Sequence, residues 1–152
     1  MTKKLLKSLR TFLESQSFVR ISLKKTATQH FKVNATINGV SGVFIVDTGA
    51  SNSCIGFSSI NYFKMKAEDT EIKAAGAGAT NMHTQISHSN TLCFSVWKKN
   101  KMSFIIIDLS HVNEALESAN ETAVHGIIGA DLLKKGRAVI DYGRNCLYLK
   151  QI

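Results

Sequence analysis

The chain has 152 residues, of which 44% are hydrophobic, so it can bury the core of one domain without disulfides or metals. Its 19 Lys and Arg against 11 Asp and Glu give a net charge of +8, but no nucleic-acid-binding motif accompanies this charge, which argues against a nucleic-acid partner. The three cysteines, Cys54, Cys93 and Cys146, are odd in number and far apart, which argues against a disulfide framework and predicts reduced thiols in a cytoplasmic protein.

Residues Thr2 to Ser15 predict an amphipathic basic helix, because apolar side chains recur there at helical spacing. These side chains are Leu5, Leu6, Leu9, Phe12 and Leu13. We assign residues 1–17 to this helix and expect it to pack on its own domain or on a partner subunit. Contact with a membrane surface is the alternative, since Lys and Arg lie largely on the other face. We expect neither a transmembrane helix nor a secretion signal.

Alternation of apolar and polar residues predicts strands from Phe18 onward and again from Phe31 to Ile37. Asn38-Gly39 is a favoured pair for a tight hairpin turn, so we expect a hairpin whose second strand runs on through the apolar residues Val43 to Val46. The residues that follow Val46 are therefore expected at the end of the second strand of this hairpin.

Those residues are Asp47-Thr48-Gly49-Ala50-Ser51. An ionised carboxylate at the end of a buried strand is costly unless it has water or a partner, so we interpret Asp47 as a residue kept for chemistry, with Gly49 allowing a tight turn. The alternative is an ordinary turn, since Asp, Thr and Gly all suit turns.

The middle of the chain predicts short elements. Ser53 to Gly56 is expected to be a strand and Ser58 to Phe63 a short helix capped by Ser58 or Ser59. The Gly-rich segment 74–81 lacks the Lys-Ser or Lys-Thr ending of a phosphate loop. Residues 91–97 and 102–109 are predicted to be strands of a hairpin whose turn is Lys98 to Lys101, with residues 104–107 in the core.

The last part of the chain predicts one or two helical turns within Ser110 to Asn120, a strand over Gly126 to Gly129, and a short helix from Asp131 to Gly136 that Asp131 caps. Strands over 137–140 and 146–149 are expected to flank a turn at 141–145. The five histidines show no metal-ligand spacing, and no serine stands in a glycine-framed nucleophile turn.

Two of these motifs resemble one family. Two hydrophobic residues followed by Asp47-Thr48-Gly49-Ala50-Ser51 resemble the active-site loop of aspartic peptidases. The segment Gly126-Ile127-Ile128-Gly129-Ala130-Asp131-Leu132-Leu133 is similar to the one that closes this loop in retropepsin-like domains. The resemblance covers about Phe18 to Leu149 and implies a domain over 18–152. The expected fold is mainly β, a closed retropepsin-like acid-protease barrel with one short C-terminal helix and the added N-terminal helix.

The implied activity is that of an aspartic endopeptidase acting on peptides or proteins. Two carboxylates held close together share one proton, so one can activate water while the other polarises the carbonyl. Because the chain has one Asp-Thr-Gly, we expect a homodimer in which Asp47 faces Asp47 of a second copy. The mechanism needs no metal or other cofactor.

The resemblance also implies roles for neighbouring residues. Thr48 would hydrogen-bond across the dimer axis, Gly49 would leave room for substrate, and Ala50 and Ser51 would line the site. Three residues would support the loop from behind: Ile127, Ile128 and Gly129.

A mobile flap would extend over about residues 70–89, with Gly76 and Gly78 near its tip; an ordinary flexible loop is the alternative. Retroviral enzymes carry an Arg after the second signature, paired with an Asp just beyond the catalytic loop. Ala130 and Ser51 occupy these places here, which points to cellular or bacterial relatives. Two other functions stay open, namely a retropepsin-like module that binds peptide or dimerises without cutting, and a basic nucleic-acid-binding domain.

Overall fold

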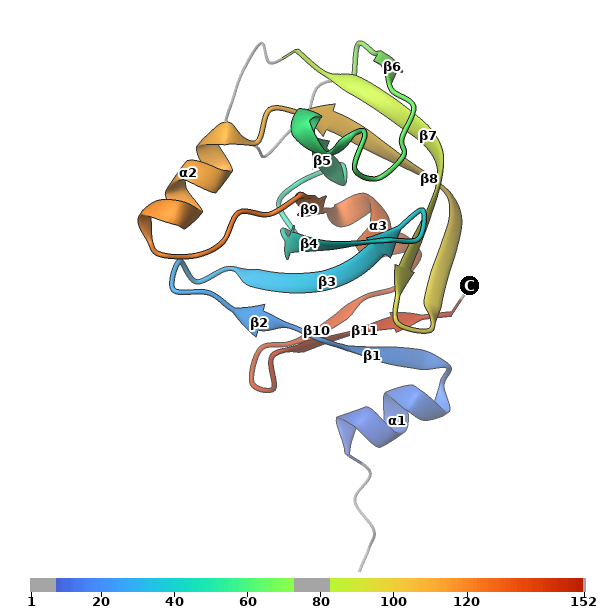
Figure 1. Cartoon of the computed structure of the whole chain (residues 1–152). Helices are drawn as coiled ribbons and strands as arrows, with labels where there is room; N and C mark the ends of the chain where they lie inside the picture. Colours follow the sequence, from blue (N-terminus) through green and yellow to red (C-terminus); the bar gives the residue numbers. More distant parts are fainter. Residues whose placement is uncertain (1–7, 73–82, 152) are drawn as a thin grey trace, which may run out of the picture.

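The computed structural model of the protein describes residues 8–72 and 83–151 (Figure 1). Strands dominate these residues, and the helices are short. In chain order the elements are α1 (Leu9–Ser15), β1 (Phe18–Ser22), β2 (Lys24–Lys25), β3 (Phe31–Ile37), β4 (Val40–Val46), β5 (Cys54–Gly56), the 3₁₀ helix η1 (Phe57–Ser59), β6 (Glu68–Asp69), β7 (Gln85–Phe94), β8 (Trp97–Ile107), α2 (Ser110–Ser118), β9 (Gly126–Ile128), α3 (Ala130–Lys135), β10 (Val139–Asp141) and β11 (Cys146–Lys150).

The larger sheet closes on itself. Its strands follow the order β3-β4-β9-β5-β8-β7, and β7 pairs back with β3 through Thr36↔Cys93 and Ile37↔Leu92. The short strands β2 and β6 extend it at β3 and β7. Inward-facing side chains of these strands fill the barrel with the main apolar core, which includes Phe44, Phe104 and Trp97, each fully buried. The mainly β, closed barrel predicted from the sequence is therefore confirmed.

The hairpin β3–β4 forms as predicted. Asn38 and Gly39 both have positive φ, 52° and 82°, which is the geometry of the two-residue turn that Asn-Gly favours, and Ile37 pairs with Val40 across it. Gly42 is required at the middle of β4 because a Cβ there would lie 2.6 Å from Cζ of the buried Phe63. This close packing fixes the strand that leads to Asp47.

Strand β9 lies between β4 and β5, although it comes much later in the chain. It is parallel to β4, with Val46 opposite Ile128, and antiparallel to β5, with Cys54 opposite Ile127. Gly126 permits this arrangement, because a Cβ there would lie 2.2 Å from the Cys54 carbonyl oxygen. The two stretches that the sequence singled out as motifs are thus neighbours in space.

A second, three-stranded sheet has the order β1-β11-β10, which leaves β10 at one edge. Leu147 and Leu149 of β11 face the barrel core, whereas Cys146 and Tyr148 face the other way and are covered by Leu13 of α1. Figure 1 shows α1 below β1, on the far side of this sheet from the barrel. The N-terminal helix therefore packs on its own domain over Leu9–Ser15, while residues 2–7 of the predicted helix lie outside the described residues.

Two local predictions are wrong. The β7–β8 hairpin turns at Ser95 and Val96, because Phe94 pairs with Trp97, and residues 98–101 belong to β8. These residues resembled a turn because their polar side chains lie on the exposed outer surface. Ser58 to Phe63 does not form a capped α-helix either: it starts as the 3₁₀ helix η1, whose N-cap is Gly56 without a side-chain hydrogen bond, and continues as turns.

The remaining predictions for the C-terminal part hold. α2 forms within residues 110–120, α3 carries Asp131 in its first turn and two lysines in its last, and β10 and β11 flank a turn. Residues 104–107 of β8 are buried. Over residues 8–72 and 83–151, none of the helices has the length and apolar composition needed to cross a bilayer.

Candidate active site

Asp47 lies at the end of β4, where the strand opens into the loop. Its backbone N–H donates to the Ile128 carbonyl (2.9 Å), and its own carbonyl accepts from Ala50 N–H (3.2 Å). The Oδ1 atom accepts from Gly49 N–H at 2.9 Å, which is the only hydrogen bond to this carboxylate within the described part of the chain. Thr48 and Gly49 are exposed and Asp47 is half-buried. The loop therefore presents a carboxylate at the surface on a backbone held by β9.

A buried network fixes the far end of this loop. Asp131 Oδ1 accepts from Ser53 N–H (2.9 Å) and from the Ser53 hydroxyl (2.7 Å), and the Ser53 oxygen in turn accepts from Gly129 N–H (2.9 Å). Ala130 N–H donates to the Ala50 carbonyl at 2.7 Å. Asp131 is not the N-cap residue of α3, which is Gly129. Its carboxylate accepts from Leu132 N–H in the first turn of the helix, as a capping side chain would, and it also binds Ser53 because the loop passes directly over the start of α3.

Sequence reasoning missed Ser53 in this network. It lies two residues beyond the recognised loop and is fully buried, and its hydroxyl both donates to Asp131 and accepts from Gly129. A small polar residue directly before the apolar strand β5 was the available signal, because a buried hydroxyl needs partners.

The residues predicted to support the loop lie behind it. Gly129 approaches so closely that a Cβ would lie 2.7 Å from the Ala50 carbonyl oxygen. Ile128 points into the main core, whereas Ile127 points the other way. Ile127 belongs to a second apolar cluster together with Ala50, Cys54, Ile86, Ile105, Ile107 and Leu109. Of the loop residues expected to line the site, Ser51 is exposed, but Ala50 is buried in this cluster.

Cys54 belongs to this cluster and lies close enough to Asp131 and Asp47 for their charges to affect its pKa. Burial raises the pKa of its thiol to about 12, and the negative charges of Asp131 and then Asp47 add to this effect. The thiol donates to the Asn52 carbonyl at 3.2 Å. Cys54 is therefore a neutral thiol next to the carboxylate loop, and like Cys93 and Cys146 it is not in a disulfide.

The tip of the predicted flap, with Gly76 and Gly78, lies outside the described residues. Its two ends are described: β6 and β7 pair at Glu68↔Ile86 and Asp69↔Gln85, and the Thr84 hydroxyl donates to the Ile72 carbonyl at 2.6 Å. The ends of the segment thus lie side by side, as the ends of a hairpin do.

A groove of about 300 Å³ lies beside the loop. Thr48 forms one wall, and the other walls come from α3 and the segment leading into β10, including Ala130, Leu133 and Ile140. Strand β10, at the edge of the smaller sheet, borders the same groove. Among the described residues, an apolar surface and a strand edge without a partner thus adjoin the exposed tip of the carboxylate loop.

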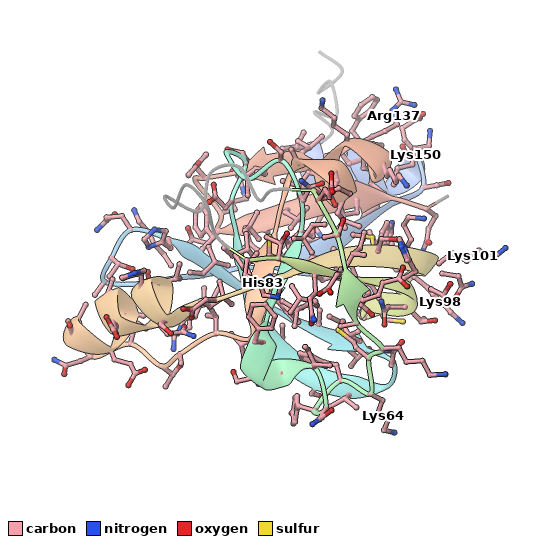
Figure 2. All side chains as sticks on the ribbon, turned by 90° about the horizontal axis from the view of Figure 1, so that it is seen from above. Lys64, His83, Lys98, Lys101, Arg137 and Lys150 are labelled. Carbon is pink, nitrogen blue, oxygen red and sulfur yellow. The ribbon has the colours of Figure 1, made fainter. Side chains whose placement is uncertain are left out.

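Four basic residues lie on one side of the molecule. In Figure 2 the labelled Lys98, Lys101, Arg137 and Lys150 lie at the side opposite α2. Helix α2 itself exposes glutamates. The described residues contain no group of three or more His, Cys, Asp or Glu side chains placed to hold a metal ion.

A family model described as aspartyl protease matches residues 33–132, a range that includes the loop, β9 and the start of α3. The match covers more than half of the chain. The protein therefore belongs to the aspartyl protease family. No curated protein matches the sequence.

Solved structures similar to this chain are retropepsin-like. The retroviral protease-like domain of Ddi1 from Leishmania major is 24% identical, with a TM-score of 0.55 over 85% of this chain and 92% of that one. A retropepsin-like aspartic protease from Rickettsia conorii is 18% identical, with a TM-score of 0.54 over 88% and 90%. EIAV protease, solved with the inhibitor HBY-793, is 18% identical, with a TM-score of 0.51 over 73% and 91%. The fold is thus that of retropepsin-like aspartic proteases.

Proposed function

We propose that the protein is an aspartic endopeptidase that acts as a homodimer, with Asp47 of each subunit at a twofold axis. The observation that carries this proposal is the carboxylate of Asp47, which stands at the surface on a loop braced by β9 and by the Asp131–Ser53 network. Membership of the aspartyl protease family supports the same assignment.

A single carboxylate cannot complete the reaction alone. When two are close, repulsion between like charges keeps one of them protonated. The ionised Asp47 takes a proton from water as the water oxygen attacks the scissile carbonyl carbon, and the protonated Asp47 gives its proton to the carbonyl oxygen. The resulting diol collapses, the C–N bond breaks, and the leaving nitrogen takes up a proton. All groups required come from two copies of this chain and water.

The surface beside Asp47 supports a symmetric dimer. Two Asp47 side chains can approach only if the exposed Thr48 and the adjoining groove lie at the contact, and the groove offers partly exposed apolar side chains such as Ala138 and Ile140 for burial. The free edge of β10 adjoins the same groove, and strand edges pair readily. In this arrangement Thr48 hydrogen-bonds across the axis.

The substrate in this proposal is an extended peptide that binds as a strand over the loop. We expect apolar side chains on either side of the cleaved bond, as the resemblance to retropepsin-like enzymes implies. The free thiols of the chain suit a reducing compartment such as the cytoplasm.

The test is the variant Asp47→Asn, assayed against a library of extended peptides with mass spectrometric detection of the products. We expect cleavage to disappear while circular dichroism and sedimentation remain unchanged, and Asp108→Asn, at an exposed position away from the loop, to cleave as the wild type does. A tenfold excess of Asp47→Asn mixed with wild type should suppress cleavage, because most wild-type subunits then pair with an inactive copy. A dimer that binds peptides but never cuts them would instead identify a non-catalytic peptide-binding module.

A further inference from the structure

The Asp131 carboxylate makes more hydrogen bonds than the start of a short helix requires. Its Oδ1 atom accepts from three donors, namely Ser53 N–H, the Ser53 hydroxyl and Leu132 N–H, at 2.9, 2.7 and 2.8 Å. Two of these donors belong to a residue 78 positions away in the sequence. The carboxylate therefore holds a distant segment in place, in addition to its favourable position in the first turn of α3.

The Ser53 hydroxyl transmits this contact to β9. Because its proton is directed at Asp131, its oxygen is free to accept from Gly129 N–H at 2.9 Å. Hydrogen bonds to a charged group are about twice as strong as neutral ones and polarise the next bond in the chain. The line from Asp131 through Ser53 to Gly129 thus joins α3, the end of the loop and β9.

Two backbone contacts place the rest of the loop relative to this line. Ala130 N–H donates to the Ala50 carbonyl at 2.7 Å, and Ile105 N–H donates to the Ser53 carbonyl at 3.0 Å. The loop is therefore fixed between Ala50 and Ser53, only a few residues from Asp47, whereas Thr48 and Gly49 are exposed. The orientation of the Asp47 carboxylate depends on this fixed half.

We infer that Asp131 is a positioning residue for the catalytic loop, acting through Ser53 to hold Asp47 in the orientation needed for the reaction. The inference rests on the proposed function and adds to it a residue that does not touch substrate. Displacing a reacting group by about 1 Å can cost about 100-fold in rate, so loss of this carboxylate should affect the chemical step more than substrate binding.

Steady-state kinetics at 20 °C, well below the unfolding temperature of each variant, test this role. We expect Asp131→Ala to lower kcat about 10–100-fold with KM changed less than about threefold, because losing a supporting hydrogen bond loosens the geometry of the site. Asp131→Asn should recover kcat to within about fivefold, since its amide oxygen can still accept from Ser53. Equal losses in the two variants, or an Asp131→Ala enzyme that is less stable yet has wild-type kcat, would refute the inference.

The chain provides a matched control. Asp108 Oδ1 likewise accepts from the backbone N–H and hydroxyl of a serine, Ser110, but the two residues are only two positions apart, at the exposed start of α2. Asp108→Ala should leave kcat unchanged. The double variant Ser53→Ala/Asp131→Ala should have a kcat no more than about twofold below that of Asp131→Ala alone, because the two residues act as one unit. If the kcat losses of the two single variants multiply in the double variant, the residues act independently, and the proposed route from Asp131 through Ser53 is wrong.

A measurement without substrate separates this inference from the proposed function. Alkylation of Cys54 by iodoacetamide, followed by peptide mass spectrometry, reports how often the loop opens, since Cys54 is buried and directly follows Ser53. Cys54 should be alkylated at least about tenfold faster in Asp131→Ala than in Asp131→Asn. Both variants lack the negative charge of Asp131, so the difference reports the lost hydrogen bonds to Ser53. If the wild type cleaves no peptide but this difference is seen, the proposed function fails while the loop-fixing role stands; equal labelling rates refute that role.

Discussion

Replacing Gly129 by Ala tests how tightly β9 and the carboxylate loop are packed. The added Cβ would lie 2.7 Å from the Ala50 carbonyl oxygen, and 2.9 Å from both the carbonyl carbon and the oxygen of Asn52. All three are backbone atoms, so no side chain can rotate away. Gly129 has φ −107°, which alanine adopts easily, so the whole effect is steric.

The size of the effect follows from these distances. Ordinary contact begins near 3.4 Å, so the loop and β9 must separate by about 0.5–0.7 Å. Overpacking of this kind costs about 1–3 kcal/mol, and the rigid backbone places this case near the upper value. For a domain of this size, a loss of about 3 kcal/mol lowers Tm by about 6–12 °C. The protein should still fold, since total stabilities are about 5–15 kcal/mol.

Thermal unfolding followed by circular dichroism at one fixed protein concentration measures this change. Gly143→Ala is the matched control, because a Cβ at that turn position meets only Asp141 Oδ1, at 3.5 Å. We expect the control to differ from wild type by less than about 1 kcal/mol. Cleavage by Gly129→Ala should fall about 100-fold as the loop is displaced. A Gly129→Ala protein whose Tm lies within about 2 °C of the control would show that the loop yields without cost and would refute this reasoning.

Two further predictions concern ionisation. Because burial and the neighbouring carboxylates raise the pKa of Cys54 to about 12, iodoacetamide at pH 8.5 should modify the half-exposed Cys93 at least about tenfold faster than Cys54; equal rates would contradict the buried position. Burial lowers the pKa of His125 below its usual value of 6.5, so the unfolded chain binds this proton more readily and stability falls as the pH drops below about 6.5. The Tm difference between pH 7.5 and pH 5 should therefore shrink in His125→Gln, and an unchanged difference would count against this assignment.

Much of the fold could be predicted because its signals are local. Alternation in β3, the Asn38-Gly39 turn and the apolar run of β8 depend on residues near each other in sequence. The turn of the β7–β8 hairpin escaped prediction because Ser95 adopts a positive φ of 52° without being glycine or asparagine. The polar run Lys98 to Lys101 that follows it looked like a turn although it belongs to strand β8.

The candidate site divides in the same way. The loop from Asp47 to Ser51 and the β9 segment could be predicted from their motifs, since each motif is a continuous stretch of sequence. The contact of Asp131 with Ser53 joins residues on different elements, and nothing in the local pattern of either one indicates the other. Helix capping was the natural local interpretation of Asp131, and only the path of the loop over α3 shows that its carboxylate also binds Ser53.

The position of β9 between β4 and β5 also determines when the site can form. Roughly 80 residues separate Val46 from its neighbour Ile128, and translation at about 5–20 residues per second therefore delivers β9 several seconds after Asp47. Until then β4 has β3 on one side only, and Asp47 N–H lacks its acceptor, the Ile128 carbonyl. If the protein cleaves peptides as proposed, a nascent chain that has not yet released β9 from the ribosome lacks the completed site.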